Sequence, residues 1–158
     1  MFRVAAAQSL VQRTEDPRVK ASTQDTAPVG IEESDRFMPR FDASGLIPCV
    51  TLDAASGDVL MVAWMNDVAL QLTLESGFVH YWSRSRQSIW KKGETSGAYQ
   101  RAVEIRTDCD QDVVLIRAAV GDRANTCHTG RETCFYRRVP LGAGPIERSF
   151  EPADTDPG

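Results

Sequence analysis

The sequence predicts an α+β fold, in which a mainly antiparallel β-sheet and one or two helices form a single compact domain. Short apolar runs rich in β-forming residues recur along the middle of the chain with turn residues between them. One further stretch has helix-capping residues at both ends. The length of 158 residues fits one domain with tails, and a hydrophobic content of 42% is enough for its core.

The two ends of the chain differ in composition from the middle. Residues 1–35 combine Pro, Thr, Gln, Asp and Glu with little apolar periodicity, so we expect a disordered N-terminal extension. Residues 147–158 are acidic and contain proline, and we expect a flexible tail. The folded unit is therefore predicted to be residues 36–146.

The first two elements of this unit are expected to form a hairpin. Apolar runs occupy residues 47–53 and 59–64, and Ser56 and Gly57 between them are turn formers. Further strands are predicted by similar composition. They are expected at 78–83, 100–107 and 113–120, with a last one at 134–139, while Gly, Ser and Thr predict a loop over 90–99.

A helix is predicted between the second and third strands. Asn66 can cap its N-terminus, residues 67–76 form its body, and Gly77 can end it in a left-handed conformation. Four apolar side chains are expected to face the core: Val68, Leu70, Leu72 and Leu74.

Charge and cysteine usage limit the classes of partner and compartment. A net charge of −4 gives no basic footprint, so neither nucleic acid nor a membrane surface is an expected partner. No apolar run approaches the ~20 residues that cross a bilayer, and the N-terminus lacks a signal-peptide core. We expect a soluble, cytoplasmic protein, whose four cysteines are free thiols or metal ligands in preference to disulfides.

Two short pieces concentrate the candidate chemistry: Asp-Cys-Asp-Gln-Asp at 108–112 and Cys-His-Thr-Gly-Arg-Glu-Thr-Cys at 127–134. Thiolates favour zinc and carboxylates favour magnesium, so a segment that mixes both indicates two metals. If the preceding strand continues through the first piece, its three carboxylates point to one face and its thiol to the other. That thiol would then meet other ligands on a facing element, in its own chain or in a partner chain.

Three cysteines fit a catalytic zinc site, which keeps one position open for water. Cys127 and Cys134 flank Gly130, and a loop of this length can present both sulfurs to one ion, with Cys109 as the third. Cys49 lies in an apolar run and is expected to be a buried structural thiol. Either metal motif alone has an ordinary structural explanation, as a solvated acidic turn or as two core cysteines; their occurrence together favours metal binding.

The same residues carry a resemblance to a known family. Four stretches resemble, in chain order, the motifs of phosphoribosyl-AMP cyclohydrolase of histidine biosynthesis: GDVLMVAWMN (57–66), YWSRSRQSIWKKGETSG (81–97), DCDQD (108–112) and CHTGRETCF (127–135). The resemblance implies that residues 36–146 are a cyclohydrolase-like catalytic domain. It implies hydrolysis of the N1–C6 bond of the adenine ring in 1-(5-phosphoribosyl)-AMP, a step of L-histidine biosynthesis.

The resemblance also implies cofactors and an assembly. Family members are homodimers with active sites at the subunit interface, and they use zinc and magnesium. Carried over by motif, the zinc ligands are Cys109, Cys127 and Cys134, with Cys109 given by the partner subunit. The implied magnesium ligands are Asp108, Asp110 and Asp112.

The expected mechanism uses zinc-activated water, because zinc lowers the pKa of bound water toward ~7. His128 adjoins Cys127 and is expected to handle protons instead of binding metal. A substrate with two phosphates and a purine is expected to bind cationic side chains, backbone N–H groups that glycine lets approach closely, and an aromatic ring that stacks on the base. The predicted substrate-binding residues are Trp82, Ser83, Arg84, Arg86, Lys92, Gly93, Glu94 and Ser96.

Three other interpretations remain open from the residues alone. A zinc nucleobase deaminase would carry H-x-E followed by P-C-x-x-C, whereas His80 is followed by Tyr81 and Trp82 and no P-C-x-x-C occurs. A zinc-stabilised binding module without catalysis would have four ligands and no open position. A secreted, disulfide-bonded domain would have no free thiols.

Overall fold

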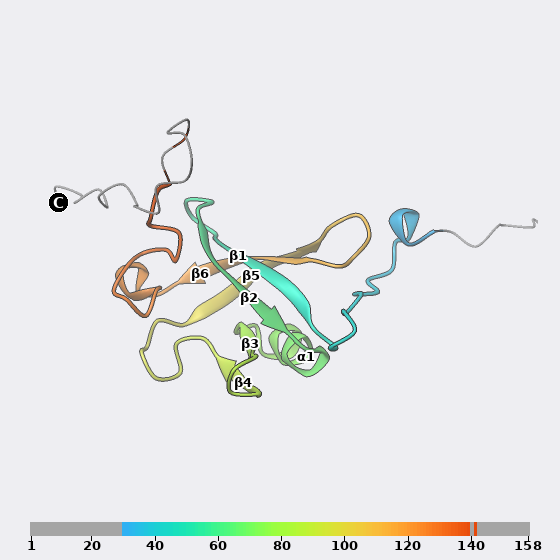
Figure 1. Cartoon of the computed structure of the whole chain (residues 1–158), viewed down its shortest axis with the longest axis horizontal. Coiled ribbons are helices and arrows are strands. Elements are labelled where there is room, and N and C mark those ends of the chain that lie inside the picture. The colour runs from blue at the N-terminus through green and yellow to red at the C-terminus, as the bar shows by residue number, and fades with distance from the viewer. Residues whose placement is uncertain (1–29, 140, 142–158) are drawn as a thin grey trace, which may run out of the picture.

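A computed structural model describes residues 30–139 and 141 of the chain, in which six strands form one sheet in the order β4-β3-β2-β1-β6-β5 (Figure 1). The helix α1 (Asp67–Ser76) packs against β3, and short 3-10 helices, η1 (Ile31–Glu33) and η2 (Arg123–Asn125), lie outside the sheet. The strands are β1 (Ile47–Asp53), β2 (Val59–Met65), β3 (His80–Ser83), β4 (Ser88–Lys91), β5 (Gln100–Thr107) and β6 (Val114–Val120).

The predicted single α+β domain is confirmed, with a sheet that is mixed and curled. β1 runs parallel to β6, and the other neighbouring strands are antiparallel. The sheet curls so that the segment before β3 meets the start of β5: Val79 N donates to Gln100 O at 3.0 Å, and Ala102 N donates to Gly77 O at 2.9 Å. In the part of the chain that the structure describes, no helix has the length and apolar character needed to cross a membrane.

The predicted domain limits fall largely outside the described residues. The expected extension at 1–35 is described only from residue 30 onward, and the expected tail at 147–158 lies wholly outside. Both limits therefore remain predictions.

The predicted β1–β2 hairpin is confirmed, and its turn is held by one carboxylate. Asp53 accepts hydrogen bonds from Ala55 N at 3.3 Å and from the Ser56 hydroxyl at 3.0 Å. Gly57 follows with φ 82°, in the left-handed region that glycine adopts without strain. Arg123, in the segment after β6, also makes hydrogen bonds to this turn.

The predicted helix and both of its caps are confirmed. Asn66 Oδ1 accepts from Ala69 N at 2.9 Å and so satisfies one of the free N–H groups of the first turn. Gly77 has φ 70°, and its N–H donates to Thr73 O. Asn66 begins α1 and Gly77 ends it, so the two residues fix the length of the helix between β2 and β3 and the place where β3 starts.

The predicted apolar face of α1 is wrong except for Leu70. Residues two apart in a helix differ by ~200° in direction, so an alternating set cannot share one face. The buried side chains of α1 are Ala69, Leu70 and Thr73, at spacings that do share a face. The exposed members of the predicted set are Val68, Leu72 and Leu74.

Two strand predictions need correction. Residues 88–91 form β4, whereas the loop predicted over 90–99 begins only after Lys91. The turn before β4 contains no glycine and is made by Gln87 with φ 50°. Residues 134–139 are not a strand, because Cys134 N reaches Leu60 O and no ladder continues from there.

The core is apolar around one buried polar network. The Tyr81 ring is fully buried, and its hydroxyl is hydrogen-bonded to Thr51 Oγ1 and Gln100 Oε1, each at 2.7 Å. Cys49 lies beside this network and is fully buried, as predicted, and burial raises the pKa of its thiol to about 12. All four cysteines are free thiols in the structure, and no disulfide links any two of them within the chain.

Candidate active site

The loop that follows η2 brings two predicted zinc ligands together. We call residues 126–134 the cysteine loop. Cys127 N donates to Arg131 O at 2.8 Å, and Gly130 N donates back to Cys127 O at 3.0 Å, which closes a tight turn. Cys134 N donates to Leu60 O at 2.8 Å and so ties the end of the loop to β2. The two thiols lie close enough for each to influence the ionisation of the other.

The two thiols of the pair differ in the direction in which their pKa values are shifted. Burial opposes ionisation of Cys127, but hydrogen bonds from Thr129 and Cys134, together with the charge of Lys92, lower the pKa of its thiol below the usual value. Cys134 shows the reverse: burial first, and then the bond and negative charge of Cys127, raise its pKa to about 11. Two soft sulfur donors on one loop suit a zinc ion, which binds cysteine as the thiolate and so releases its protons on binding.

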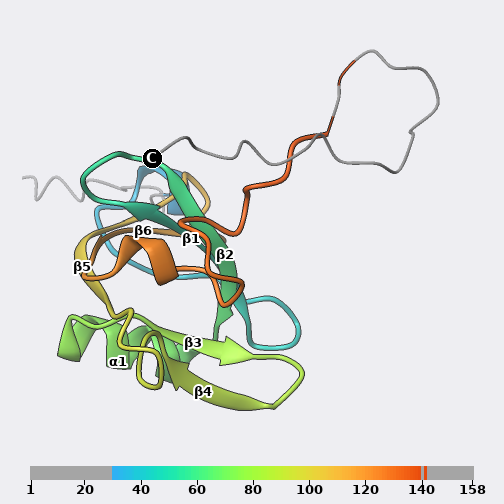
Figure 2. The same cartoon turned by 90° about the vertical axis from the view of Figure 1, so that its left-hand side faces the viewer.

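Residues of the cysteine loop, of β4 and of the loop after β4 line a cavity of about 670 Å³. The ribbons of the chain after β6 (orange) and of β4 can be followed in Figure 2. Lys92 is half-buried in its wall and donates from Nζ to Thr126 O. The Thr126 hydroxyl is buried and has no hydrogen-bond partner among the described residues. Buried hydroxyls are normally satisfied, so this one is an exception in the wall of the cavity.

The structure divides the predicted substrate-binding residues between two pockets. Five of them line the cavity beside the cysteines: Arg86, Lys92, Gly93, Glu94 and Ser96. Trp82 and Arg84 line a second pocket of about 490 Å³ with Ser44 and Asn66. Ser83 lines neither of these pockets, and its hydroxyl accepts from Arg86 N at 3.3 Å. Thr126 and Met61 also line the cavity, and neither was predicted, because a single threonine and a strand methionine carry no motif signal.

His128 lies at the rim of the same cavity. Its Nδ1 is 4.0 Å from Cys127 Sγ, and the residue is exposed. Its place beside the thiols is compatible with proton handling, and that role remains a prediction.

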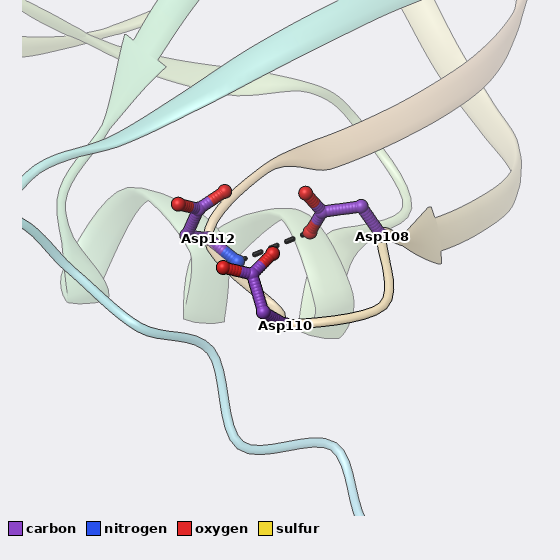
Figure 3. Close-up of side chains that lie close together, drawn as sticks. All are labelled: Asp108, Asp110 and Asp112. Atoms are coloured by element: carbon purple, nitrogen blue, oxygen red, sulfur yellow. Dashed lines mark hydrogen bonds between the residues drawn. The ribbon is translucent and has the colours of Figure 1, made fainter. Parts of the chain in front are cut away.

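The three predicted magnesium ligands come together in a turn and not on a strand. One oxygen from each carboxylate of Asp108, Asp110 and Asp112 lies within 4.8 Å of the others (Figure 3). β5 ends at Thr107, and Asp108 Oδ1 then accepts from the N–H groups of residues 112 and 113, each at 3.1 Å. The expected strand continuation is therefore wrong, although the carboxylates do converge. We call residues 108–112 the acidic turn.

Mutual repulsion is visible in the acidic turn. Partial burial and the neighbouring charges of Asp110 and Asp108 raise the pKa of Asp112 above its usual value. A divalent cation held between the three carboxylates would relieve this repulsion, and oxygen donors are the type that magnesium prefers. The donor set therefore fits magnesium.

A side chain that sequence reasoning missed holds the acidic turn. Gln111 is buried, with φ 59°. Its Oε1 accepts from Met38 N at 2.6 Å, and its Nε2 donates to Arg36 O at 3.0 Å. Arg40 adds a bond from its N–H to Gln111 O at 2.7 Å and an ion pair with Asp110 at 3.4 Å. The segment at 36–40 is thus hydrogen-bonded to the turn. No local sequence pattern predicts this contact, because the two segments lie about 70 residues apart in the chain.

Cys109 is exposed and lies far from the other two predicted zinc ligands in its own chain. β6 connects the acidic turn to the loop that carries Cys127 and Cys134, so the two regions lie at opposite ends of this strand (Figure 1). Its seven residues span about 20 Å at ~3.3 Å per residue. No zinc ion reaches all three thiols of one chain, because zinc–sulfur bonds are ~2.3 Å long.

Comparison with known proteins identifies relatives along most of the chain. The sequence profile described as phosphoribosyl-AMP cyclohydrolase matches residues 61–136. A protein of that name from Brucella anthropi is 58% identical over 123 residues, which make up 78% of this chain and 87% of the relative. Another from Nitrobacter hamburgensis is 56% identical over 133 residues, which make up 79% of this chain and 89% of the relative.

The matched region contains both metal-ligand motifs and most of the cavity wall described above. The resemblance found in the motifs is confirmed by this identity and coverage. The chain belongs to the phosphoribosyl-AMP cyclohydrolase family.

Proposed function

We propose that this chain hydrolyses the N1–C6 bond of the adenine ring in 1-(5-phosphoribosyl)-AMP, in the histidine biosynthetic pathway. The relatives named phosphoribosyl-AMP cyclohydrolase support the reaction. The observation that carries the proposal is the cavity itself, since paired thiols, a histidine and a basic wall line the same space. A non-catalytic zinc module would need none of this wall.

The cysteine pair is proposed to hold zinc, with Cys109 of a second subunit as third ligand. Two thiols on one loop fit the metal, and β6 keeps the third thiol of the same chain out of reach. A homodimer is the simplest assembly that completes the set, because two-fold symmetry gives each subunit's pair the other subunit's Cys109. When bound, zinc supplies an activated water as nucleophile.

Magnesium is proposed to bind the acidic turn. Cys109 is part of this turn, so a partner that brings its thiol to the cysteine pair also brings its three carboxylates to the cavity. Both metals then belong to one composite site, made from the acidic turn of one subunit and the cysteine loop of the other. The two phosphate groups of the substrate would meet magnesium there as well as the basic wall.

The chain's own residues bind and orient the substrate and move protons. Arg86 and Lys92 line the cavity and can bind phosphate, the first as a fork and the second as a point charge. Burial lowers the pKa of Lys92, and the charges of Cys134 and Cys127 work against that change. His128 lines the same cavity and is proposed to exchange protons with the reacting ring.

Ring opening followed by absorbance, together with zinc analysis, tests this function. Wild-type protein is expected to open phosphoribosyl-AMP, and Cys127→Ala is expected to lose both zinc and activity. Cys49→Ala is the matched control, because that thiol is buried in β1, and it should keep its zinc. A wild type that carries zinc but leaves the substrate unchanged would overturn the function, and a Cys127→Ala protein with zinc and activity would overturn the site.

Gln111→Ala is expected to weaken divalent-metal binding at the acidic turn by about tenfold, the effect typical of residues that orient metal ligands. The substitution removes both side-chain bonds to the segment at 36–40, which frees the turn. Manganese titration by electron paramagnetic resonance measures the change. Gln87→Ala is the control, because Gln87 also has a positive φ but lies in the β3–β4 turn. Equal manganese affinity in the two variants would contradict the prediction.

A further inference from the structure

Arg123 joins the loop that carries both cysteines to the β1–β2 turn. Its Nη1 donates to Asp53 Oδ2 at 2.6 Å and to the Ser56 hydroxyl at 3.0 Å. Nη2 donates to Asp58 Oδ2 at 2.5 Å, and Nε donates to Glu132 Oε2 at 2.8 Å. All three guanidinium nitrogens are therefore used, and their acceptors come from two separate parts of the chain.

The charge balance of this cluster depends on the one arginine. Three carboxylates surround a single cation, and Asp53 is buried. The bonds from Ser56 and Arg123 hold the pKa of Asp58 below its usual value, so the carboxylate is ionised in the folded protein. Without the guanidinium, three negative charges would face one another, and Glu132 would have no partner in the cluster.

The anchored residues, Arg123 and Glu132, lie on either side of Cys127 in the chain. Arg123 lies four residues before Cys127, and Glu132 lies two residues before Cys134. The end of the loop is also fixed to β2, through Cys134 N to Leu60 O and the Thr133 hydroxyl to Val59 O at 2.6 Å. The start of the loop has no such backbone tie to β2 among the described residues. Together with the bond from Lys92 Nζ to Thr126 O, Arg123 therefore fixes where Cys127 lies relative to Cys134.

We infer that Arg123 is a positioning residue for the zinc site. By binding the carboxylates of Asp53, Asp58 and Glu132 at the same time, it presets the separation of the two thiols. This inference rests on the proposed zinc site and adds to it a determinant outside the ligands and outside the cavity lining. Lysine cannot replace it, because an ammonium is a single point and cannot hold the hairpin and Glu132 in one plane.

Zinc affinity by chelator competition, and the absorption spectrum of the cobalt-substituted protein, test the inference. Arg123→Met is expected to bind zinc about 10- to 100-fold more weakly than wild type, with altered cobalt–thiolate bands. Arg123→Lys keeps the positive charge and is expected to recover stability but not zinc affinity. Thermal unfolding of each variant separates the two effects.

Arg117→Met is the matched control. Arg117 also reaches the β1–β2 turn, by a hydrogen bond from Nη2 to Ala54 O at 2.9 Å, and it forms an ion pair with Glu104. It should lose stability with little change in zinc affinity. Equal losses of zinc affinity in Arg117→Met and Arg123→Met, or an unchanged cobalt spectrum in both Arg123 variants, would overturn the inference. A wild type that binds no zinc would instead reject the proposed zinc site, and the inference with it.

Discussion

Mixing two inactive variants, Cys109→Ala and Cys127→Ala, is expected to restore ring-opening activity. In a two-fold dimer with shared ligands, the mixed dimer has one site that lacks both residues and one site that is intact. Random exchange makes about half of the dimers mixed, so activity should recover to about one quarter of the wild-type value. The measurement is the absorbance assay after subunit exchange, with zinc content followed in parallel.

A second mixture controls for any non-specific rescue. Cys127 and Cys134 belong to the same loop, so a mixture of Cys127→Ala with Cys134→Ala never forms an intact site. This mixture should stay inactive at every ratio. Recovery in this second mixture, or none in the first, would contradict a zinc site that is shared between subunits.

Gly93→Ala is expected to have the largest effect of any single-methyl addition in the cavity wall. Gly93 has φ 86°, and a Cβ there would lie 2.3 Å from Tyr99 N and 2.4 Å from the carbonyl carbon of Ala98. These are backbone atoms that cannot rotate away, so the loop must move. Backbone strain and overpacking together should cost about 3 kcal/mol or more of the unfolding free energy. The adjacent cavity residues Lys92 and Glu94 would be displaced with it.

Gly97→Ala is the control that introduces backbone strain from a positive φ without a steric clash of the new Cβ. Gly97 has φ 78°, but a Cβ there meets no atom within 4 Å. This variant should lose only about 1 kcal/mol in urea unfolding and should keep most of its activity. A similar loss in both alanine variants would mean that the close approach of Ala98 and Tyr99 does not determine the loop.

The sequence predicts those elements whose signals are local. The Asn66 cap, the Gly77 stop and the Ser56-Gly57 turn each satisfy or relax backbone groups within a few residues, and all are found in the structure. The parallel pairing of β1 with β6 has no local signal, since it depends on which distant strands meet. The end of β4 falls in the stretch 90–99, whose Gly, Ser and Thr content predicts a loop. The turn before β4 has no local signal either, because Gln87 takes its positive φ in place of the usual glycine.

The same distinction between local signals and contacts of distant residues applies to the candidate site. The spacing of Cys127 and Cys134 predicted their meeting, because the loop between them is short. The convergence of Asp108, Asp110 and Asp112 was predicted for the wrong reason: a tight turn brings them together, and strand alternation does not. Neither Arg123 nor Gln111 could be found by motif, because each acts on residues remote in sequence.

The parallel β1–β6 ladder also sets an order of events during synthesis. The β1–β2 hairpin can close as soon as its own residues have emerged, since its contacts are local. The other side of β1 must wait for β6, which is made much later and must enter between β1 and β5. Both cysteines of the pair follow β6 in the chain. A nascent chain therefore contains all six strands of its sheet before it contains the paired thiols.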